Sequence, residues 1–174
     1  ENISESIDVL IEDQFKSISN TYLPIESIEP QWKTKELDHF LNESYSLQTN
    51  IHQTIKDDKT LIPESIESKI VEIAKESYKE KYKAIGNDRV LLEKQVMLQV
   101  LDVHWKEHLS EIDHLRGSIG LRAYAQKNPK NEFKREAYSM FENMLDEINS
   151  ETVRILFIVQ IKNHENLNSL SPEQ

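Results

Sequence analysis

The residues best suited to chemistry in this sequence are two histidines four positions apart, His104 and His108, with Glu107 between them. Side chains four apart share one face of an α-helix, so both imidazoles could approach a single metal ion. The order His-Trp-Lys-Glu-His differs, however, from the His-Glu-x-x-His arrangement that places a general base beside zinc. His108 also falls on an apolar stripe. We therefore favour a hydrogen-bonded stripe histidine beside an exposed one, and predict no metal site.

Acid–base or nucleophilic catalysis has even less support in the sequence than a metal site. Glu107, Glu111 and Asp113 lie close together in the sequence, but general acid–base catalysis needs a carboxyl pair held in a cleft with perturbed pKa values. A solvated helix face explains them more simply. Two serines lie near His114, yet a nucleophile also requires an oriented base and oxyanion donors, and nothing in the pattern supplies them. We predict no catalytic residue.

Nucleotide chemistry is excluded by the scarcity of glycine. A phosphate-binding loop uses several glycines so that backbone N–H groups can surround the phosphate oxygens. The whole chain has three glycines, and none stands in a GxxxxGK arrangement. The sequence therefore predicts no bound cofactor and no enzymatic activity for this chain on its own.

The composition favours an all-α fold. The chain has 174 residues, 30% charged and 37% apolar, with few glycines and prolines and many good helix formers. The absence of cysteine excludes disulfides and cysteine-ligated zinc. No apolar run approaches the roughly 20 residues that span a bilayer, and no signal peptide is seen. Because the chain begins on Glu1 without Met, we expect a processed chain or an excised fragment of a longer protein, and we favour the fragment.

The first half of the chain is expected to form one long helix, one or two short ones and a second long one. Apolar residues at spacings of three and four predict an amphipathic helix over 3–20. Looser patterns suggest short helices near 34–43 and 49–57. Pro63 suits the first position of a further helix, and Gly86 is well suited to close it. The apolar stripe of that helix comprises Ile66, Ile70, Ile73, Ala74, Tyr78, Tyr82 and Ile85.

The second half predicts two long helices that form an antiparallel hairpin. The first covers about 88–118, and the return helix begins at Asn128-Pro129, a cap followed by a first-position proline, and runs to about 161. A turn this short forces the two helices to be antiparallel. A heptad-like spacing on the first helix predicts an apolar seam that faces a partner helix. The seam residues are Leu98, Leu101, Trp105, His108, Ile112 and Leu115.

The turn of the hairpin carries a local positive charge. The chain has a net charge of −10, which argues against general nucleic-acid binding. Around the turn, in contrast, the basic residues are Arg116, Arg122, Lys127, Lys130, Lys134 and Arg135, with Glu132 as the one acid. Tyr124 lies among them, and loops on rigid scaffolds often carry binding contacts. Two interpretations stay open, a solvated turn with an incidental tyrosine and a contact site for an acidic surface or an extended polypeptide.

The hairpin sequence resembles SecA, the motor subunit of bacterial preprotein translocase. The likeness is ungapped over about 45 residues, and it is looser upstream. It rests on the segments MLQVLD (97–102), WKEHL (105–109), DHLR (113–116), IGLRAYAQKNP (119–129) and EFKREAYSMF (132–141). The resemblance implies a scaffold-helix end at 1–21, a helical wing domain at 22–87, a two-helix finger at 88–162 and a polar tail at 163–174.

The resemblance also implies a function. In the family, the finger reaches the cytoplasmic mouth of the SecYEG channel and touches the translocating polypeptide, with its tip aromatic at the position of Tyr124. The ATPase, with its ATP and Mg²⁺, lies in motor domains outside this sequence. The implied partners are SecYEG, unfolded preprotein, the motor domains of the same protein and an anionic lipid surface. The implied location is the cytoplasm, peripheral to the bacterial inner membrane.

A different class of protein is kept as an alternative. A stand-alone helical adaptor could bind a partner helix through an exposed apolar seam. Both interpretations predict an exposed apolar patch along Leu98–Ile112. They differ in the gene, because only the SecA interpretation requires a long upstream coding region with phosphate-loop motifs.

Overall fold

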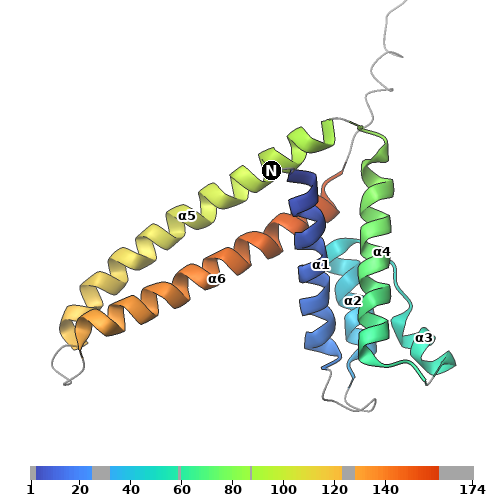
Figure 1. Ribbon diagram of the computed structural model, residues 1–174, viewed down its shortest axis with the longest axis horizontal. Helices are drawn as coiled ribbons and strands as arrows, with labels where there is room; N and C mark the ends of the chain where they lie inside the picture. Colours follow the sequence, from blue (N-terminus) through green and yellow to red (C-terminus); the bar gives the residue numbers. More distant parts are fainter. Residues whose placement is uncertain (1–2, 25–31, 59, 87, 123–127, 161–174) are drawn as a thin grey trace, which may run out of the picture. The chain divides into compact units, whose positions relative to one another are not determined.

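The computed structural model describes residues 3–24, 32–58, 60–86, 88–122 and 128–160, with the side chains of 120–122 left out. Over these residues the chain forms six α-helices and no strand, which confirms the all-α prediction (Figure 1). The helices are α1 (Ile3–Tyr22), α2 (Thr34–Tyr45), α3 (Ile51–Asp57), α4 (Pro63–Lys83), α5 (Asp88–Arg122) and α6 (Pro129–Ile158).

The chain divides into two compact units. The first, which we call the body, comprises Glu1–Glu93 together with Val153–Gln174. The second, which we call the hairpin unit, is Lys94–Thr152. Helices α5 and α6 both contribute residues to each unit, since α5 enters the hairpin unit after Glu93 and α6 leaves it after Thr152.

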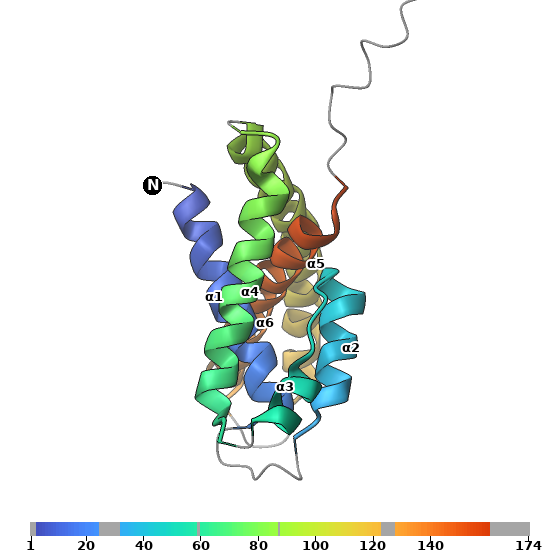
Figure 2. The same cartoon turned by 90° about the vertical axis from the view of Figure 1, so that its right-hand side faces the viewer.

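The body is built on the pairing of α1 with α4. These helices run side by side and antiparallel, as the two views show (Figures 1 and 2). Ile7, Ile11 and Phe15 of α1 are fully buried, as are Ala74 of α4 and, nearly so, Ile70. Their spacings of three to four residues place them on one stripe of each helix. Burial of these stripes supplies the main driving force for the pairing.

Helix α6 ends in an aromatic cluster inside the body. The ring of Phe157 lies 5.2 Å from that of Phe15, 5.8 Å from that of Tyr45 and 5.6 Å from that of Tyr78, measured between centroids. These partners come from α1, α2 and α4. Phe157 is 4% exposed, so one side chain joins three helices at the centre of the core.

The hairpin unit consists of the outer parts of α5 and α6, which run antiparallel (Figure 1). The N-terminus of α6 is capped as the sequence predicts. The Asn128 side-chain oxygen accepts a hydrogen bond of 3.2 Å from the Lys130 N–H, and Pro129 occupies the first helical position. In the part of the chain that the structure describes, no helix combines the length and apolar character needed to cross a bilayer.

The two hairpin helices end at different residues from those predicted. Helix α5 continues through Gly117 to Arg122, beyond the expected end near 118. A glycine inside a helix costs about 1 kcal/mol, and the burial of Leu115 and Ile119 on either side of Gly117 offsets that cost. Helix α6 stops at Ile158 instead of continuing to about 161. Gly86 has a φ of +52°, the left-handed conformation expected of a residue that follows a helix.

Helix α3 receives its N-terminal cap from a residue on α2. The Asp38 carboxylate accepts hydrogen bonds of 2.9 Å from the N–H groups of both Ile51 and His52, and one of 2.6 Å from the Thr49 hydroxyl. The residue at the cap position, Asn50, makes no side-chain cap hydrogen bond. The short α3 therefore depends on α2 for the satisfaction of its first amides.

Replacement of Asp38 by alanine is expected to lower the free energy of unfolding by about 1 kcal/mol, because two N-terminal amides of α3 lose their acceptor. Urea denaturation followed by circular dichroism measures this change. Glu43→Ala, which removes an exposed carboxylate from the same helix, serves as the control and should change the value by roughly 0.5 kcal/mol or less. Equal effects from the two variants would contradict the capping role.

Candidate functional site: the helical hairpin and its base

The predicted seam residues of α5 do not share one environment. Leu115 and His108 are 7% exposed, and Ile112 is half-buried. In contrast, Leu98 is 65% exposed, Trp105 44% and Leu101 42%. No helix of the described chain covers these three, and that they face a partner helix stays a prediction. They are the exposed apolar patch that the sequence predicted along Leu98–Ile112.

The buried stripe of α5 follows a different spacing from the heptad. It passes through Val96, Val100, His108, Leu115 and Ile119, each less than 9% exposed. Successive members of this buried set are four, eight, seven and four residues apart, whereas the predicted seam alternates steps of three and four and shares only His108 and Leu115 with it. Because α5 carries apolar residues on several faces, periodicity alone could not tell the face that packs within the chain from the face left exposed.

His108 lies among aromatic rings inside the hairpin unit. Its ring centroid is 5.9 Å from that of Trp105 and 6.0 Å from that of Phe141 on α6. Its Nδ1 atom is buried and has no hydrogen-bond partner within the described structure. The sequence predicted a hydrogen-bonded histidine at this position, but the Nδ1 atom of His108 makes no such bond.

His104 is the histidine that makes polar contacts. Its Nε2 atom lies 2.6 Å from the Glu151 carboxylate, and its Nδ1 atom lies 3.4 Å from Glu147, both on α6. The Glu107 carboxylate, on α5 itself, also lies 3.9 Å from the Nδ1 atom of His104. The side chain is 13% exposed, so the prediction of an exposed histidine is wrong. Because one imidazole bridges α5 and α6, His104 ties the two helices of the hairpin together.

A groove between α5 and α6 has a volume of about 720 Å³ and is lined by histidines and glutamates, His104, His108 and Glu111 among them. Across the described ranges, no group of three or more His, Asp or Glu side chains is arranged to hold a metal ion. Ser118 donates its hydroxyl proton to the Leu115 carbonyl at 3.0 Å, so it is engaged as a helix-surface side chain. The groove thus offers polar side chains without an oriented nucleophile at Ser118.

The basic residues near the turn are exposed where the structure describes them. Arg116 lies 3.6 Å from Asp113, with both side chains 80% exposed, and Arg135 lies 4.0 Å from Glu132. Lys130 and Lys134 are also exposed. Tyr124 and Lys127 lie outside the described residues, and so does the side chain of Arg122, the last residue of α5. The structure therefore gives no contact for the predicted tip aromatic.

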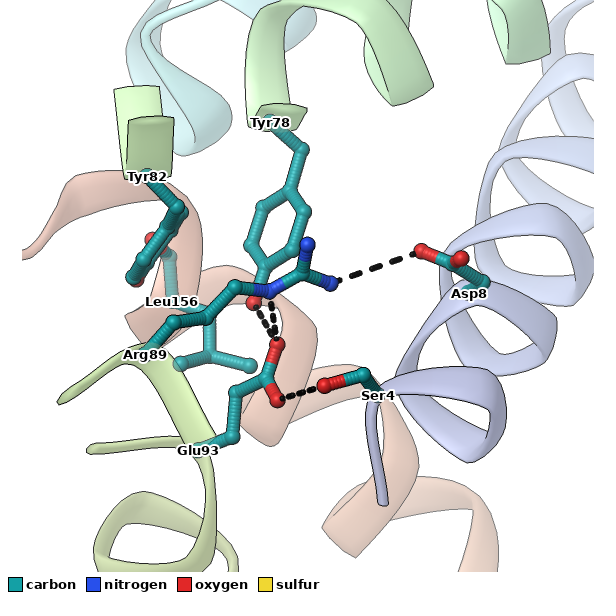
Figure 3. Close-up of polar contacts among 7 residues, drawn as sticks. All are labelled: Ser4, Asp8, Tyr78, Tyr82, Arg89, Glu93 and Leu156. Carbon is teal, nitrogen blue, oxygen red and sulfur yellow. Dashed lines mark hydrogen bonds and ion pairs between the residues drawn. The ribbon is translucent and has the colours of Figure 1, made fainter. Parts of the chain in front are cut away.

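Sequence reasoning missed a buried polar cluster at the base of α5, drawn in Figure 3. Its centre is Glu93, whose side chain is completely buried. The Glu93 carboxylate accepts hydrogen bonds from the Tyr78 hydroxyl at 2.9 Å, from Arg89 Nε at 2.6 Å and from the Ser4 hydroxyl at 2.9 Å. These donors come from α4, α5 and α1. Three donors and one positive charge compensate the burial of the carboxylate.

Arg89 extends the cluster to α1. Its guanidinium carbon lies 4.9 Å from the centre of the Tyr78 ring, and one terminal nitrogen lies 3.7 Å from the Asp8 carboxylate. Figure 3 shows the guanidinium beside the Tyr78 ring with this nitrogen directed toward Asp8. The arrangement combines a cation–π contact with two ion pairs, of which the one to Glu93 is the closer.

The base of α6 is held from the same face of α4. The Tyr82 hydroxyl donates to the Leu156 carbonyl at 2.8 Å, and Lys81 Nζ donates to the carbonyls of Leu156 and Phe157. These carbonyls belong to the last turn of α6, where no intrahelical donor follows. Side chains of α4 thus satisfy two of the terminal acceptors of α6, which ends at Ile158.

Burial and the nearby Glu93 carboxylate raise the pKa of Tyr78 far above its usual range and raise the pKa of Tyr82 to about 12. Burial also lowers the pKa of Lys81. Both tyrosines therefore keep their protons in the folded chain at neutral pH and stay hydrogen-bond donors. The rings themselves lie 4.5 Å apart between centroids.

The body is all-helical, and its buried polar groups hold the ends of helices together. These features are those of a helical scaffold domain. Comparison with known proteins identifies which scaffold it is. The family model of the SecA wing and scaffold domain matches residues 1–160. The chain belongs to this family.

One relative shows the extent of the likeness. The protein translocase subunit SecA of Dechloromonas aromatica (strain RCB) is 40% identical over 173 residues, which is 99% of this chain and 19% of that protein. The chain thus spans about a fifth of the length of the relative it matches. This confirms the resemblance expected from the hairpin motifs, and the match covers nearly the whole chain.

Leu115 and Leu98 test which face of α5 is buried, because the same truncation can be made at both. Leu115→Ala is expected to lower the free energy of unfolding by about 2–5 kcal/mol, since it leaves a cavity between helices. Leu98→Ala should change it by roughly 0.5 kcal/mol or less. Chemical denaturation of both variants measures the difference. A larger loss at Leu98 would restore the heptad interpretation.

Alkaline unfolding tests the state of Tyr82. Its pKa is raised in the folded chain, so its contribution to stability is present below the ordinary pKa of 10 and is lost as the pH rises toward 12. We expect the stability of the parent to fall between pH 10 and 12, and that of Tyr82→Phe to fall less steeply. Urea midpoints measured from pH 8 to 12 check this. Parallel curves for the two proteins would show that Tyr82 ionises normally.

Proposed function

We propose that this chain is the wing and finger portion of a SecA motor, and that its hairpin guides unfolded polypeptide into the SecYEG channel. Membership of the SecA wing and scaffold family is the observation that carries the proposal. The whole motor would hydrolyse ATP with Mg²⁺ in domains outside this chain, which itself has no enzymatic role and binds no cofactor. It would act in the cytoplasm, at the periphery of the inner membrane.

The hairpin has features suited to this work. Two helices tied together by His104 and by the buried Leu115 form an extended element that can transmit displacement along its length. The exposed Arg116, Lys130 and Lys134 lie near its turn and would attract the channel mouth or anionic lipid headgroups. Tyr124, which lies between α5 and α6 in the sequence, would grip passing side chains by apolar contact without sequence preference.

The exposed Leu98, Leu101 and Trp105 are compatible with the same proposal. A chain that spans a fifth of its relative leaves most of a longer protein available to cover them. A stand-alone adaptor would use the same patch for a separate partner, but it would not require the match to a SecA domain along nearly the whole chain.

The proposal is tested at Tyr124 in the full-length motor. Tyr124→Ala and Tyr124→Asp should reduce preprotein import into inverted membrane vesicles by an order of magnitude or more, because a small or charged side chain cannot grip apolar segments. Tyr124→Phe keeps the ring and is the matched control, with import close to that of the parent. Normal import by both the Ala and Asp variants would contradict the assignment of Tyr124 as the residue that contacts the polypeptide.

A further inference from the structure

We propose that the groove between α5 and α6 is a binding site for an organic polycation, and specifically for a linear polyamine. The groove lies within the hairpin unit, because all of its lining residues fall between His104 and Ser118 or between Met140 and Glu147. Its volume of about 720 Å³ is in the range of small-molecule sites in proteins. The inference goes beyond the proposed transport function, which requires no such ligand.

The groove is lined by negative side chains without a lysine or arginine to balance them. Glu107 and Glu111 of α5 and Glu147 of α6 all contribute to the lining. In the part of the chain that the structure describes, none of the three forms an ion pair with a lysine or arginine. Carboxylates on a protein surface are often only solvated, so the negative charge does not define a site without further evidence.

Two of these carboxylates approach the same imidazole nitrogen from opposite helices. Glu147 lies 3.4 Å and Glu107 3.9 Å from Nδ1 of His104, while Glu151 lies 2.6 Å from Nε2. A neutral imidazole donates from only one of its nitrogens, so it cannot satisfy carboxylates on both sides. Even a protonated ring brings one positive charge to three negative ones. A cation bound between the helices would reduce the repulsion that remains.

His108 gives independent evidence for a ligand. Its side chain lines the groove and is 7% exposed, yet its Nδ1 atom has no hydrogen-bond partner within the described structure. Buried polar atoms in native proteins are nearly always hydrogen-bonded. An ammonium group has several N–H donors and no acceptor, so one ligand can donate both to the lone pair of this nitrogen and to the nearby carboxylates.

The lining favours an extended organic cation over a metal ion. In the described ranges, no three His, Asp or Glu side chains are arranged to ligate a metal. Leu115 and Met144, both buried, also line the groove and offer apolar surface to the methylene segments of a polyamine. Glu107 and Glu111 are four residues apart, or about 6 Å along the axis of α5. This separation is similar to that of neighbouring amines in a linear polyamine.

Calorimetric titration with spermidine tests the site in the full-length protein that contains this chain, at constant ionic strength. The double variant Glu107→Gln with Glu147→Gln should weaken binding about tenfold, because two charged contacts to the ligand are lost. The parent side chains are 67% and 66% exposed, so glutamine at these positions leaves the packing of the helices unchanged. His108→Phe keeps a ring of similar size but removes the nitrogen, and it should weaken binding several-fold.

Glu142→Gln with Asp146→Asn is the matched control. This pair removes the same two charges from exposed positions of α6 that do not line the groove. The affinity for spermidine should stay within about twofold of that of the parent, because exposed charges outside a site contribute little.

Two results would overturn the proposal. One is the absence of spermidine binding by the parent. The other is an equal loss of affinity in the Glu107 and Glu147 pair and in the control pair, which would show general attraction to an acidic surface. Since the measurement is binding and not import, its outcome is independent of the result at Tyr124.

Discussion

The buried carboxylate of Glu93 is the constraint on which the organisation of the body depends. A charge without solvent is tolerated only where donors surround it, and here the donors must come from α1, α4 and α5. The three helices therefore meet at Glu93, because the carboxylate needs a donor from each of them. Apolar contacts alone would not impose this meeting point. Arg89, held over Tyr78 and near Asp8, supplies the compensating charge from within the same cluster.

The apolar core packs next to the Glu93 cluster. Phe157 stands between Phe15, Tyr45 and Tyr78, so the end of α6 is packed where the tyrosine hydroxyls are used. Tyr78 takes part in both systems, with its ring in the aromatic cluster and its oxygen on Glu93. Apolar burial supplies much of the stability, and the polar contacts select the register in which the helices meet.

The sequence predicts the helices well because each carries a local signal. Pro63, Gly86 and the Asn128-Pro129 pair mark helix ends through backbone chemistry that depends on a few neighbouring residues. The sequence does not tell which face of α5 is buried within the chain, because Leu98 and Leu115 are the same residue type and only the packing of the helices distinguishes them. The contacts of Asp38 and Glu93 were not foreseen, because their partners are brought together by the tertiary fold. Tyr124, the proposed contact residue, was found through family resemblance, and the described residues do not include it.

The division of the chain has a consequence for the order in which it folds. The body is discontinuous, since its core includes Phe157 as well as residues of α1 to α4. As the chain emerges from a ribosome, α1 to α4 must wait for the whole hairpin to be synthesised before their core closes. Until then Phe15, Tyr45 and Tyr78 lack their common partner, and the surface that it covers stays open to solvent. The contact between Phe15 and Phe157 joins positions 142 residues apart, and such distant pairing is slow to form. During synthesis, α1 to α4 of this chain therefore lack the residue that completes their core until α6 has been made.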